Sequence, residues 1–300
     1  MATAVAQPPS ALARGRSRPR FRIRFGISPR YFITLPLAAF AILPIIYIIS
    51  TAFKPLEELL LFPPPFFVRN PTLDNFTDLL LSFGSLSVPF TRYLFNSLFV
   101  VIVLTFSGAV LASLAAYPLA KLNPPLGNAL FALIVAGLLF PPEVLAIPRY
   151  IVVANLGIID TYWALILPNI AVPLGMFLMK QFMEQLPTEI LEAARVDGAS
   201  EWTVFWRIAM PMVSPAWNTV IILSFIAFWN DSFSPVVFTR SEAMKTVPYA
   251  MITIQAGANF IARQGAAAAA VFVMTTPTIL VFILRQAKVV QTFAHAGIKS

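Results

Sequence analysis

The sequence predicts an all-α membrane protein with six transmembrane helices. The chain of 300 residues is 58% hydrophobic and 11% charged, with a mean hydropathy of +0.80. Soluble domains are about 25% charged. The chain also contains six apolar runs that are long enough to cross a bilayer, because about 20 helical residues span the ~30 Å hydrocarbon core. The predicted spans are 31–53, 94–120, 127–147, 161–179, 216–238 and 266–285.

Residues 1–30 are expected to form a basic, disordered cytoplasmic tail before the first span. Seven arginines lie in this tail, and no acidic residue occurs before Glu57. Such a composition fits the cytoplasmic face of a membrane, where the leaflet is negatively charged. The run 31–53 lacks a clear cleavage site, so we expect an uncleaved first span rather than a secretory signal. An organelle transit peptide shares the Arg-rich, acid-free composition and is the alternative.

Prolines mark where the spans are interrupted or bent. The segment from Lys54 to about Arg92 contains Pro63–Pro65 and Asn70-Pro71, which forbid one continuous helix, so a loop is expected there. Prolines inside predicted spans predict kinks; they are Pro168, Pro173 and Pro277. The run Ala266–Ala270 predicts close helix packing, since small residues let membrane helices approach one another.

The lysines and arginines predict the orientation of the six spans. With both termini on one side, that side carries 14 of these residues and the other side carries 7. Positive residues accumulate on the cytoplasmic side of membrane proteins. We therefore expect both termini and residues 180–215 to lie in the cytoplasm.

Residues 180–215 are a charged loop between two apolar runs and cannot lie in hydrocarbon. The charged members are Lys180, Glu184, Glu189, Glu192, Arg195, Asp197, Glu201 and Arg207. Two short helices are predicted, with Thr188 and Ser200 as N-caps. Asp197-Gly198 is expected to separate them, because glycine tolerates the left-handed conformation that ends a helix. The second helix should carry Val204, Phe205 and Ile208 on one face and stop near Pro211. An ordinary loop between membrane helices is the simpler interpretation.

The charged loop contains Glu192-Ala193-Ala194 and Asp197-Gly198-Ala199, followed by Phe205, Ile208, Pro211 and Pro215. In residue type and in spacing, this pattern resembles the EAA loop of ABC-importer permeases. The resemblance implies that the loop is the helix that couples the permease to its ATPase, with the Glu192 carboxylate facing an ATPase arginine and Gly198 at the turn. The implied ATPase-coupling residues are Glu192, Ala193, Ala194, Asp197, Gly198, Ala199, Phe205, Ile208 and Pro211.

Other segments resemble the smaller, six-span subunit of maltose-type carbohydrate permeases. They include Asn96-Ser97-Leu98, Ala116–Ala120, Ile147–Tyr150, Leu156–Tyr162 and Phe228–Asp231. Over nearly all of residues 31–300, the resemblance implies a type I ABC-importer permease fold in the cytoplasmic (inner) membrane of a prokaryote. The implied function is a carbohydrate importer subunit. Its implied partners are a second permease subunit, two copies of a cytoplasmic ATPase and an extracytoplasmic sugar-binding protein.

The sequence gives no sign of catalysis, a metal site or nucleic-acid binding. It lacks the G-x-x-x-x-G-K-[ST] pattern of P-loop proteins, so ATP and magnesium are expected on the partner ATPase. No cysteine occurs, and the one histidine, His295, lies in the C-terminal tail. That tail departs from the family ending, which puts a contact between the tail and the ATPase in doubt.

The best candidates for a substrate pathway are Trp229, Asn230 and Asp231. Polar residues inside a membrane span are costly to bury, so each is first considered as part of a functional site. Tryptophan could stack on a sugar face, and the amide and carboxylate could bind its hydroxyls. A helix approaching the outer interface is an equal alternative, since tryptophan belts are common there. Glu143 is expected to be an interfacial residue rather than a ligand.

Two other functions stay open at this stage. The same machinery could import a solute that is not a sugar, such as a phosphodiester, an amino acid or phosphate. An ion-coupled carrier is the alternative from another class. It should show inverted repeats and paired intramembrane ionisable residues, and neither is visible in the sequence.

Overall fold

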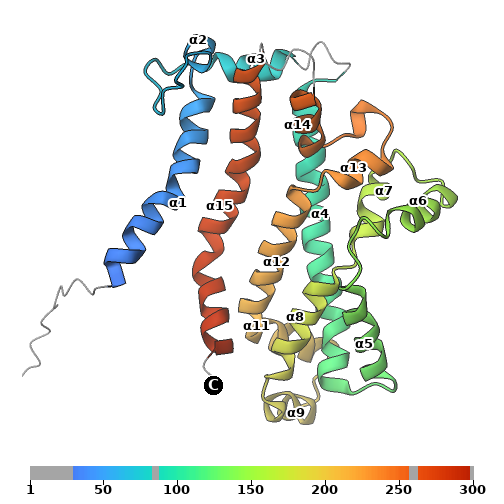
Figure 1. The fold of residues 1–300 in the computed structure, drawn as a ribbon. Coiled ribbons are helices and arrows are strands. Elements are labelled where there is room, and N and C mark those ends of the chain that lie inside the picture. Colours follow the sequence, from blue (N-terminus) through green and yellow to red (C-terminus); the bar gives the residue numbers. More distant parts are fainter. Residues whose placement is uncertain (1–29, 83–87, 257–262, 298–300) are drawn as a thin grey trace, which may run out of the picture. The chain divides into compact units, whose positions relative to one another are not determined.

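The computed structural model describes residues 30–82, 88–256 and 263–297, and every regular element in these ranges is a helix (Figure 1). The α-helices are α1 (Arg30–Ala52), α2 (Leu56–Leu59), α3 (Asp74–Ser82), α4 (Phe90–Tyr117), α5 (Gly127–Gly137), α6 (Ala146–Asn155), α7 (Tyr162–Ile166), α8 (Pro173–Glu184), α9 (Thr188–Val196), α10 (Glu201–Val204), α11 (Met210–Met212), α12 (Ser214–Trp229), α13 (Phe233–Phe238), α14 (Val247–Ala256) and α15 (Gln264–Gly297). Except for Arg30, the predicted basic tail lies outside the described residues.

The chain divides into two units, residues 1–44 and residues 45–300. In the first unit the described residues form the N-terminal part of α1, an apolar helix that contains Pro36 and Pro44. The rest of α1 and all later elements lie in the second unit.

Three helical stretches are long and apolar enough to cross a membrane: Phe32–Ala52, Phe90–Leu122 and Gln264–Leu284. They coincide with the first, second and sixth predicted spans. The second stretch consists of α4 followed by a π-helical turn, Pro118–Leu122. It starts four residues before the predicted 94, directly after Pro89, so Arg92 lies in the helix and not in the loop.

Two further stretches reach span length only as bent pairs of helices. One joins Tyr162–Asn169 to Pro173–Glu184 with a bend of 42°. Pro168 lies in the 3-10 turn Leu167–Asn169 and Pro173 starts α8, so these prolines break the helix, where only kinks were predicted. The other pair joins Glu201–Met212 to Ser214–Trp229 with a bend of 79°. Pro277 lies inside the continuous helix α15.

The predicted spans 127–147 and 216–238 are each helical over only part of their length. In the first, α5 ends at Gly137. In the second, α12 ends at Trp229 and α13 starts at Phe233. The Asp231 carboxylate causes this break, because its Oδ1 accepts hydrogen bonds from the amides of Phe233 and Ser234, at 2.9 and 3.1 Å.

Helices α4, α8 and α12 pack closely against one another through small residues. A Cβ atom on Gly175 of α8 would lie 2.9 Å from Val220 of α12, and one on Gly108 of α4 would lie 2.8 Å from Val172. Without side chains at these positions the backbones can approach one another. Near the start of α4, residues of α4 and α14 pack against four buried alanines of α15, as the alanine run predicted. These are Ala266, Ala267, Ala269 and Ala270.

The end of the molecule with α2, α3 and α14 lies opposite the end with α9 (Figure 1). At the first end, Asn75 Nδ2 donates to the carbonyls of Ala52 and Lys54, at 2.9 and 2.6 Å, which fastens α3 to the end of α1. The Cβ of any residue replacing Gly265 would lie only 2.1 Å from Asn75 Oδ1. The start of α15 is thereby fitted against the same asparagine.

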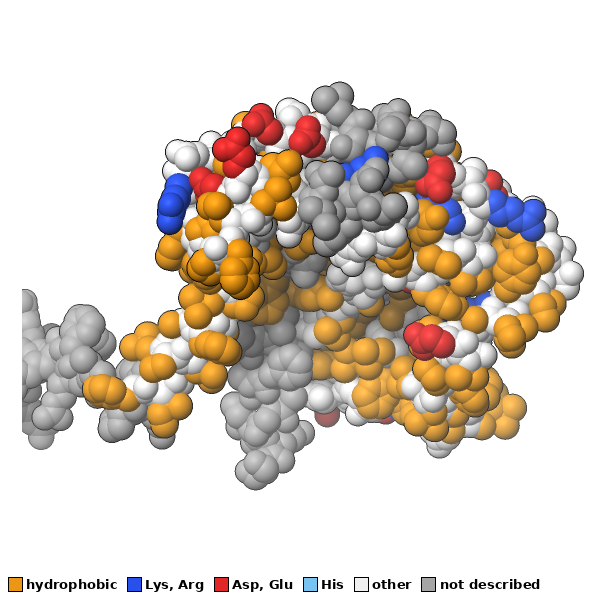
Figure 2. Space-filling model, turned by 45° about the horizontal axis from the view of Figure 1, so that its top comes forward, with side chains coloured by type: hydrophobic (Ala, Val, Ile, Leu, Met, Phe, Trp, Pro, Cys, Tyr) orange, Lys and Arg blue, Asp and Glu red, His pale blue; other side chains and the backbone are white. Residues whose placement is uncertain are grey.

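Hydrophobic side chains cover much of the described surface, while acidic and basic side chains gather near the top edge of the view in Figure 2. Helix α4 carries an exposed apolar stripe at helical spacing, consisting of Phe95, Phe99, Ile102 and Phe106, each at least 40% exposed. Such a surface suits hydrocarbon or a partner helix better than water.

Candidate functional site

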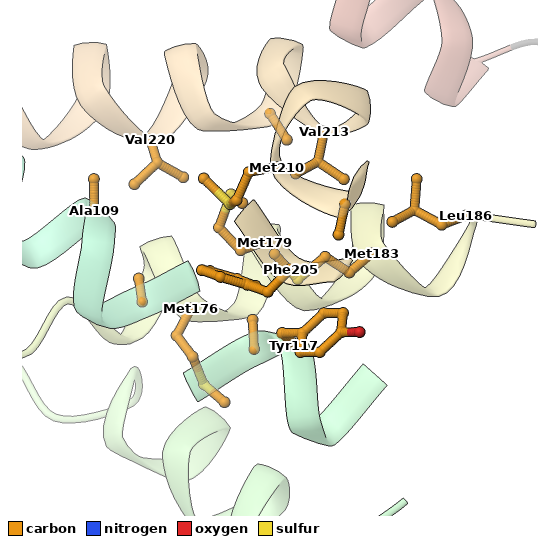
Figure 3. Packing of buried hydrophobic residues seen from close by; sticks show 14 of the residues in the cluster. Ala109, Tyr117, Met176, Met179, Met183, Leu186, Phe205, Met210, Val213 and Val220 are labelled. Atoms are coloured by element: carbon orange, nitrogen blue, oxygen red, sulfur yellow. The ribbon is translucent and has the colours of Figure 1, made fainter. Parts of the chain in front are cut away.

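The charged loop (residues 180–215) folds into α9, α10, a π-helical turn at Phe205–Ala209, and α11. Some of its apolar side chains, among them Phe205, Met210 and Val213, point into a core shared with α4, α8 and α12 (Figure 3). Leu191, Val204 and Ala209 are fully buried there, and Phe205 is 2% exposed. The Phe205 ring packs edge-on against Tyr117 of α4, with 5.3 Å between ring centroids. The loop is therefore anchored to three long helices.

The predicted break between the two short helices is confirmed. Gly198 has φ +83°, and no atom lies within 4 Å of a Cβ built on it. Its requirement for glycine is therefore conformational and not steric. Ser200 caps α10 as predicted, since its Oγ accepts a hydrogen bond from the Thr203 amide at 3.3 Å.

One detail of the predicted helices is wrong. Thr188 does not cap α9; it is the first helical residue, and Pro187 takes the cap position. The second helix ends at Met212, near Pro211 as predicted. Pro211 lies near the end of the continuous helical stretch Glu201–Met212, just after the π-helical turn Phe205–Ala209.

An ion pair joins α9 to α10 across the break. Arg195 Nε lies 2.6 Å from Glu201 Oε1, and Arg195 Nη2 lies 3.3 Å from Oε2. The Tyr117 hydroxyl donates to Glu201 Oε2 at 3.0 Å. The hydrogen bond from Arg195 holds the pKa of Glu201 below its usual value, against the opposing effect of partial burial. The charged pair therefore fixes both short helices to the end of α4.

The predicted coupling residues separate into an exposed group and an anchoring group. Glu192, Ala193, Asp197, Gly198 and Pro211 are exposed. Phe205 is buried, and Ala194, Ala199 and Ile208 are half-buried against the core. Of the three alanines in this set, Ala194 and Ala199 therefore pack inward.

The sequence interpretation missed the exposed apolar residues of this loop. The side chains of Val196 and Trp202 are 87% and 62% exposed, and Ile190 is 44% exposed. Large apolar side chains on a segment that cannot enter hydrocarbon indicate a surface that another protein covers. Their position beside polar residues in a water-exposed segment was the signal that could have identified them.

A cavity of about 440 Å³ lies alongside α12, bounded by α8, α13 and the segment 138–149. One face of α12 and its extension supplies residues at spacings of three and four: Val220, Leu223, Ser224, Ala227, Phe228 and Asp231. Such spacing is that of a single helical stripe. The cavity is therefore lined by a continuous face of this helix.

The structure separates the three predicted pathway residues. Asp231 lines the cavity. Trp229 is fully buried on another face of α12, where its Nε1 donates to the Met274 carbonyl of α15 at 2.7 Å, and it has no exposed face for a ligand. Asn230 lines a separate hollow of about 400 Å³ beside α14 and α15. Consecutive helical residues are about 100° apart around the axis, so three in a row cannot share one face.

A small hydrogen-bonded network forms the polar wall of the cavity. Asn169 Nδ2 donates to Ser234 Oγ at 3.1 Å and to the Leu165 carbonyl at 3.0 Å. Arg149 Nη1 donates to Asn169 Oδ1 over a longer 3.4 Å. Glu143, exposed, lines the same cavity. Of these four residues, only Glu143 was considered from the sequence, as a residue at the membrane–water interface. Arg149, Asn169 and Ser234 were missed because they lie far apart in the chain.

Comparison with known proteins identifies relatives along most of the chain. Residues 108–288 match the family model described as the binding-protein-dependent transport system inner membrane component. Protein LplC of Bacillus subtilis is 37% identical over 213 residues, which cover 69% of this chain and 68% of the relative. The arabinooligosaccharides transport system permease protein AraQ of Halalkalibacterium halodurans is 30% identical, over 88% of this chain and 93% of the relative.

Two further similarities bear on substrate and fold. The sn-glycerol-3-phosphate transport system permease protein UgpE of Yersinia enterocolitica is 32% identical, over 68% of this chain and 72% of the relative. A chain from the crystal structure of a bacterial ABC transporter involved in the import of the acidic polysaccharide alginate shares the fold, with a TM-score of 0.74 and 20% identity. The match covers 86% of this chain and 94% of that chain.

Proposed function

Because this chain belongs to the family of binding-protein-dependent transport system inner membrane components, we propose that it is the permease subunit of an ATP-driven carbohydrate importer. The name of the relative AraQ and the carbohydrate-permease motifs support a sugar or oligosaccharide as the solute. In this proposal the chain forms half of the translocation pathway and is not itself an enzyme. ATP and magnesium bind to the partner ATPase.

The proposed topology has six spans with both termini and the charged loop in the cytoplasm, in the inner membrane of a prokaryote. The distribution of lysine and arginine supports this orientation. A second support is that α15 ends at the same end of the molecule as α9 (Figure 1). The six crossings would be α1, α4, α5 with the segment that follows it, α7 with α8, α12 with its extension, and α15.

The observation that carries the proposal is a rigid, charged loop with exposed apolar side chains. Glu192 and Asp197 offer carboxylates to basic groups on an ATPase, and charge-assisted hydrogen bonds are about twice as strong as neutral ones. Val196 and Trp202 would enter an apolar groove on that partner. Two copies of the ATPase would serve this chain and a second permease subunit.

Movement of the ATPase would reach the membrane helices through the anchored side of the loop. Phe205 and Val204 pack into the core between α4, α8 and α12. The Arg195–Glu201–Tyr117 contacts bind the loop to α4. A displacement of α9 and α10 is thus transmitted to α4, α8 and α12, which would alternately open the pathway to the sugar-binding protein outside and to the cytoplasm.

Within the pathway, Asp231 is the proposed contact of the three residues first considered. It lines the cavity, whereas Trp229 packs against α15 and Asn230 faces a different hollow. The relative UgpE supports a second candidate, in which the same machinery imports a phosphorylated polyol.

Co-purification with the partner proteins tests the proposal. The chain is expressed with its partner permease and ATPase, as wild type, Glu192→Ala and Gly198→Val. We expect both variants to insert into the membrane but to lose ATPase association or transport-coupled hydrolysis. An unchanged complex with unchanged transport would contradict the coupling role of the loop.

A further inference from the structure

The cavity beside α12 has the size and the mixed lining of a small-molecule site. Its volume of about 440 Å³ lies within the roughly 300–1,000 Å³ of typical ligand pockets. Most lining residues are apolar, and Phe228 and Phe233 contribute aromatic surface. Sugar rings present apolar C–H faces that pack well on such surfaces. A few polar groups interrupt this lining on one wall.

The polar groups on that wall come from three elements and offer both donors and acceptors. Arg149 lies on α6, Asn169 in the turn before α8, and Ser234 on α13. The guanidinium has five N–H donors, and the one bond described for it uses a single donor. Asp231 uses Oδ1 to cap α13, which leaves Oδ2 as an acceptor. A hydroxyl both donates and accepts, so it matches such a wall.

The charge of the lining argues against an anionic ligand. Among the described residues around the cavity, three are charged at neutral pH: Arg149, Glu143 and Asp231. Two carboxylates against one guanidinium leave a net charge of −1. A phosphate or uronate would be repelled by this balance, whereas an uncharged polyol would not.

We propose that this cavity is a subsite for an uncharged, hydroxyl-rich ligand, a neutral saccharide unit, contacted by Arg149, Asn169 and Asp231. The subsite rests on the proposed function as a sugar permease and narrows it, because it excludes phosphorylated polyols and acidic sugars as preferred solutes. The chain itself then contributes to substrate selection.

The absence of cysteine from the natural sequence allows a direct test of the cavity. Ala227 and Ala171 line the cavity, are exposed and belong to no polar contact described above, so each can be replaced by cysteine. In the complex of the full chain with its partner permease and ATPase, each thiol is treated with a cationic and an anionic methanethiosulfonate reagent. Each rate is divided by that of the same variant after unfolding, which removes the intrinsic difference between the reagents.

We expect the corrected rate of the cationic reagent to exceed that of the anionic one by about tenfold, the lower end of electrostatic focusing in clefts. Adding Asp231→Asn should move this ratio toward one, and adding Arg149→Gln should raise it. Maltose should slow the labelling, whereas sn-glycerol 3-phosphate at the same concentration should not. A ratio of one or less, two unreactive thiols, or protection by the phosphate compound alone would overturn the proposal.

This labelling is carried out in the assembled complex and requires no ATP hydrolysis. A ratio below one in a complex that still couples ATP to transport contradicts only the neutral-saccharide subsite. Loss of the coupling phenotype with an intact charge preference contradicts only the proposed role of the charged loop.

Discussion

Arg195 and Glu201 are paired across the turn at Gly198, with 2.6 Å between Nε and Oε1. Their side chains are 29% and 46% exposed, so the pair lies at the edge of the charged loop and not in its core. Tyr117 binds the same carboxylate from the end of α4. These contacts therefore join α9, α10 and the end of α4 into one rigid unit. Coupling of ATPase movement to the membrane helices requires this unit to be rigid.

Glu201→Gln should weaken coupling more than it weakens the fold. An exposed ion pair contributes at most about 1 kcal/mol to stability, so the thermal unfolding midpoint should change little. Loosening the link to α4 should lower the amount of sugar transported per ATP hydrolysed several-fold. Transport and hydrolysis measured in the same proteoliposomes give this ratio.

Glu189→Gln is the matched control, because it removes an exposed carboxylate on the neighbouring helix α9 that belongs to neither described ion pair. Equal losses of coupling in the two variants would mean that the Arg195–Glu201 pair has no special role.

The stabilising contribution of Glu201 should be lost in acid. Its pKa in the folded protein is lowered, first of all by the hydrogen bond from Arg195, so the unfolded chain binds a proton before the folded one does as the pH falls. The contribution is thus complete above the unfolded glutamate pKa of about 4.3 and disappears as the pH falls through the lower folded value. The difference in unfolding midpoint between wild type and Glu201→Gln, measured from pH 7 to pH 3, should shrink as the pH falls. A difference that grows in acid would be inconsistent with this sign.

Gly198→Val and Gly198→Asn should differ, although neither side chain would meet a neighbouring atom at its Cβ. The left-handed conformation costs an ordinary residue about 1–2 kcal/mol, more for a β-branched one, and asparagine adopts it readily. Valine should therefore disturb the loop and reduce ATPase association in a pull-down assay, whereas asparagine should retain most of it. Similar losses in both variants would show that exposed backbone, and not conformation, is what glycine provides.

Gly265→Ala should destabilise the end of the molecule that contains α3. The added methyl would approach Asn75 Oδ1 to 2.1 Å, and Asn75 cannot move without breaking its bonds to Ala52 and Lys54. Overpacking of this kind costs about 1–3 kcal/mol. Gly137→Ala is the control, since nothing lies within 4 Å of its Cβ. Thermal unfolding in detergent should show a lower midpoint for Gly265→Ala than for wild type. The midpoint of Gly137→Ala should be almost unchanged.

The helical class of the fold and the organisation of the charged loop could be predicted because both depend on local signals. Residue type alone predicts a turn at Gly198 and a helix N-cap at Ser200, and both are found at these positions. The predicted spans ran past the ends of α5 and α12, because they followed average apolarity and gave no weight to Pro141-Pro142-Glu143 and Asn230-Asp231-Ser232. At α12 the cause is the Asp231 carboxylate, which starts a new helix.

The cavity was only partly predictable. Trp229, Asn230 and Asp231 are neighbours in sequence, and treating them as one site ignored the helical rotation between them. Arg149, Asn169 and Ser234 are distant in sequence and carry no motif, so only the packing of α6, the turn Leu167–Asn169 and α13 brings them together. Likewise, the Arg195–Glu201 pair depends on the direction in which the chain leaves the turn.

Photocrosslinking from the tip of the charged loop tests whether the ATPase docks on this loop. The photoreactive amino acid p-benzoylphenylalanine is placed at Val196, which is 87% exposed, or at Phe62, which is 96% exposed in the loop after α2. We expect a covalent product between the chain and the ATPase from position 196 and none from position 62. No product from 196, or equal products from both positions, would contradict docking of the ATPase on this loop.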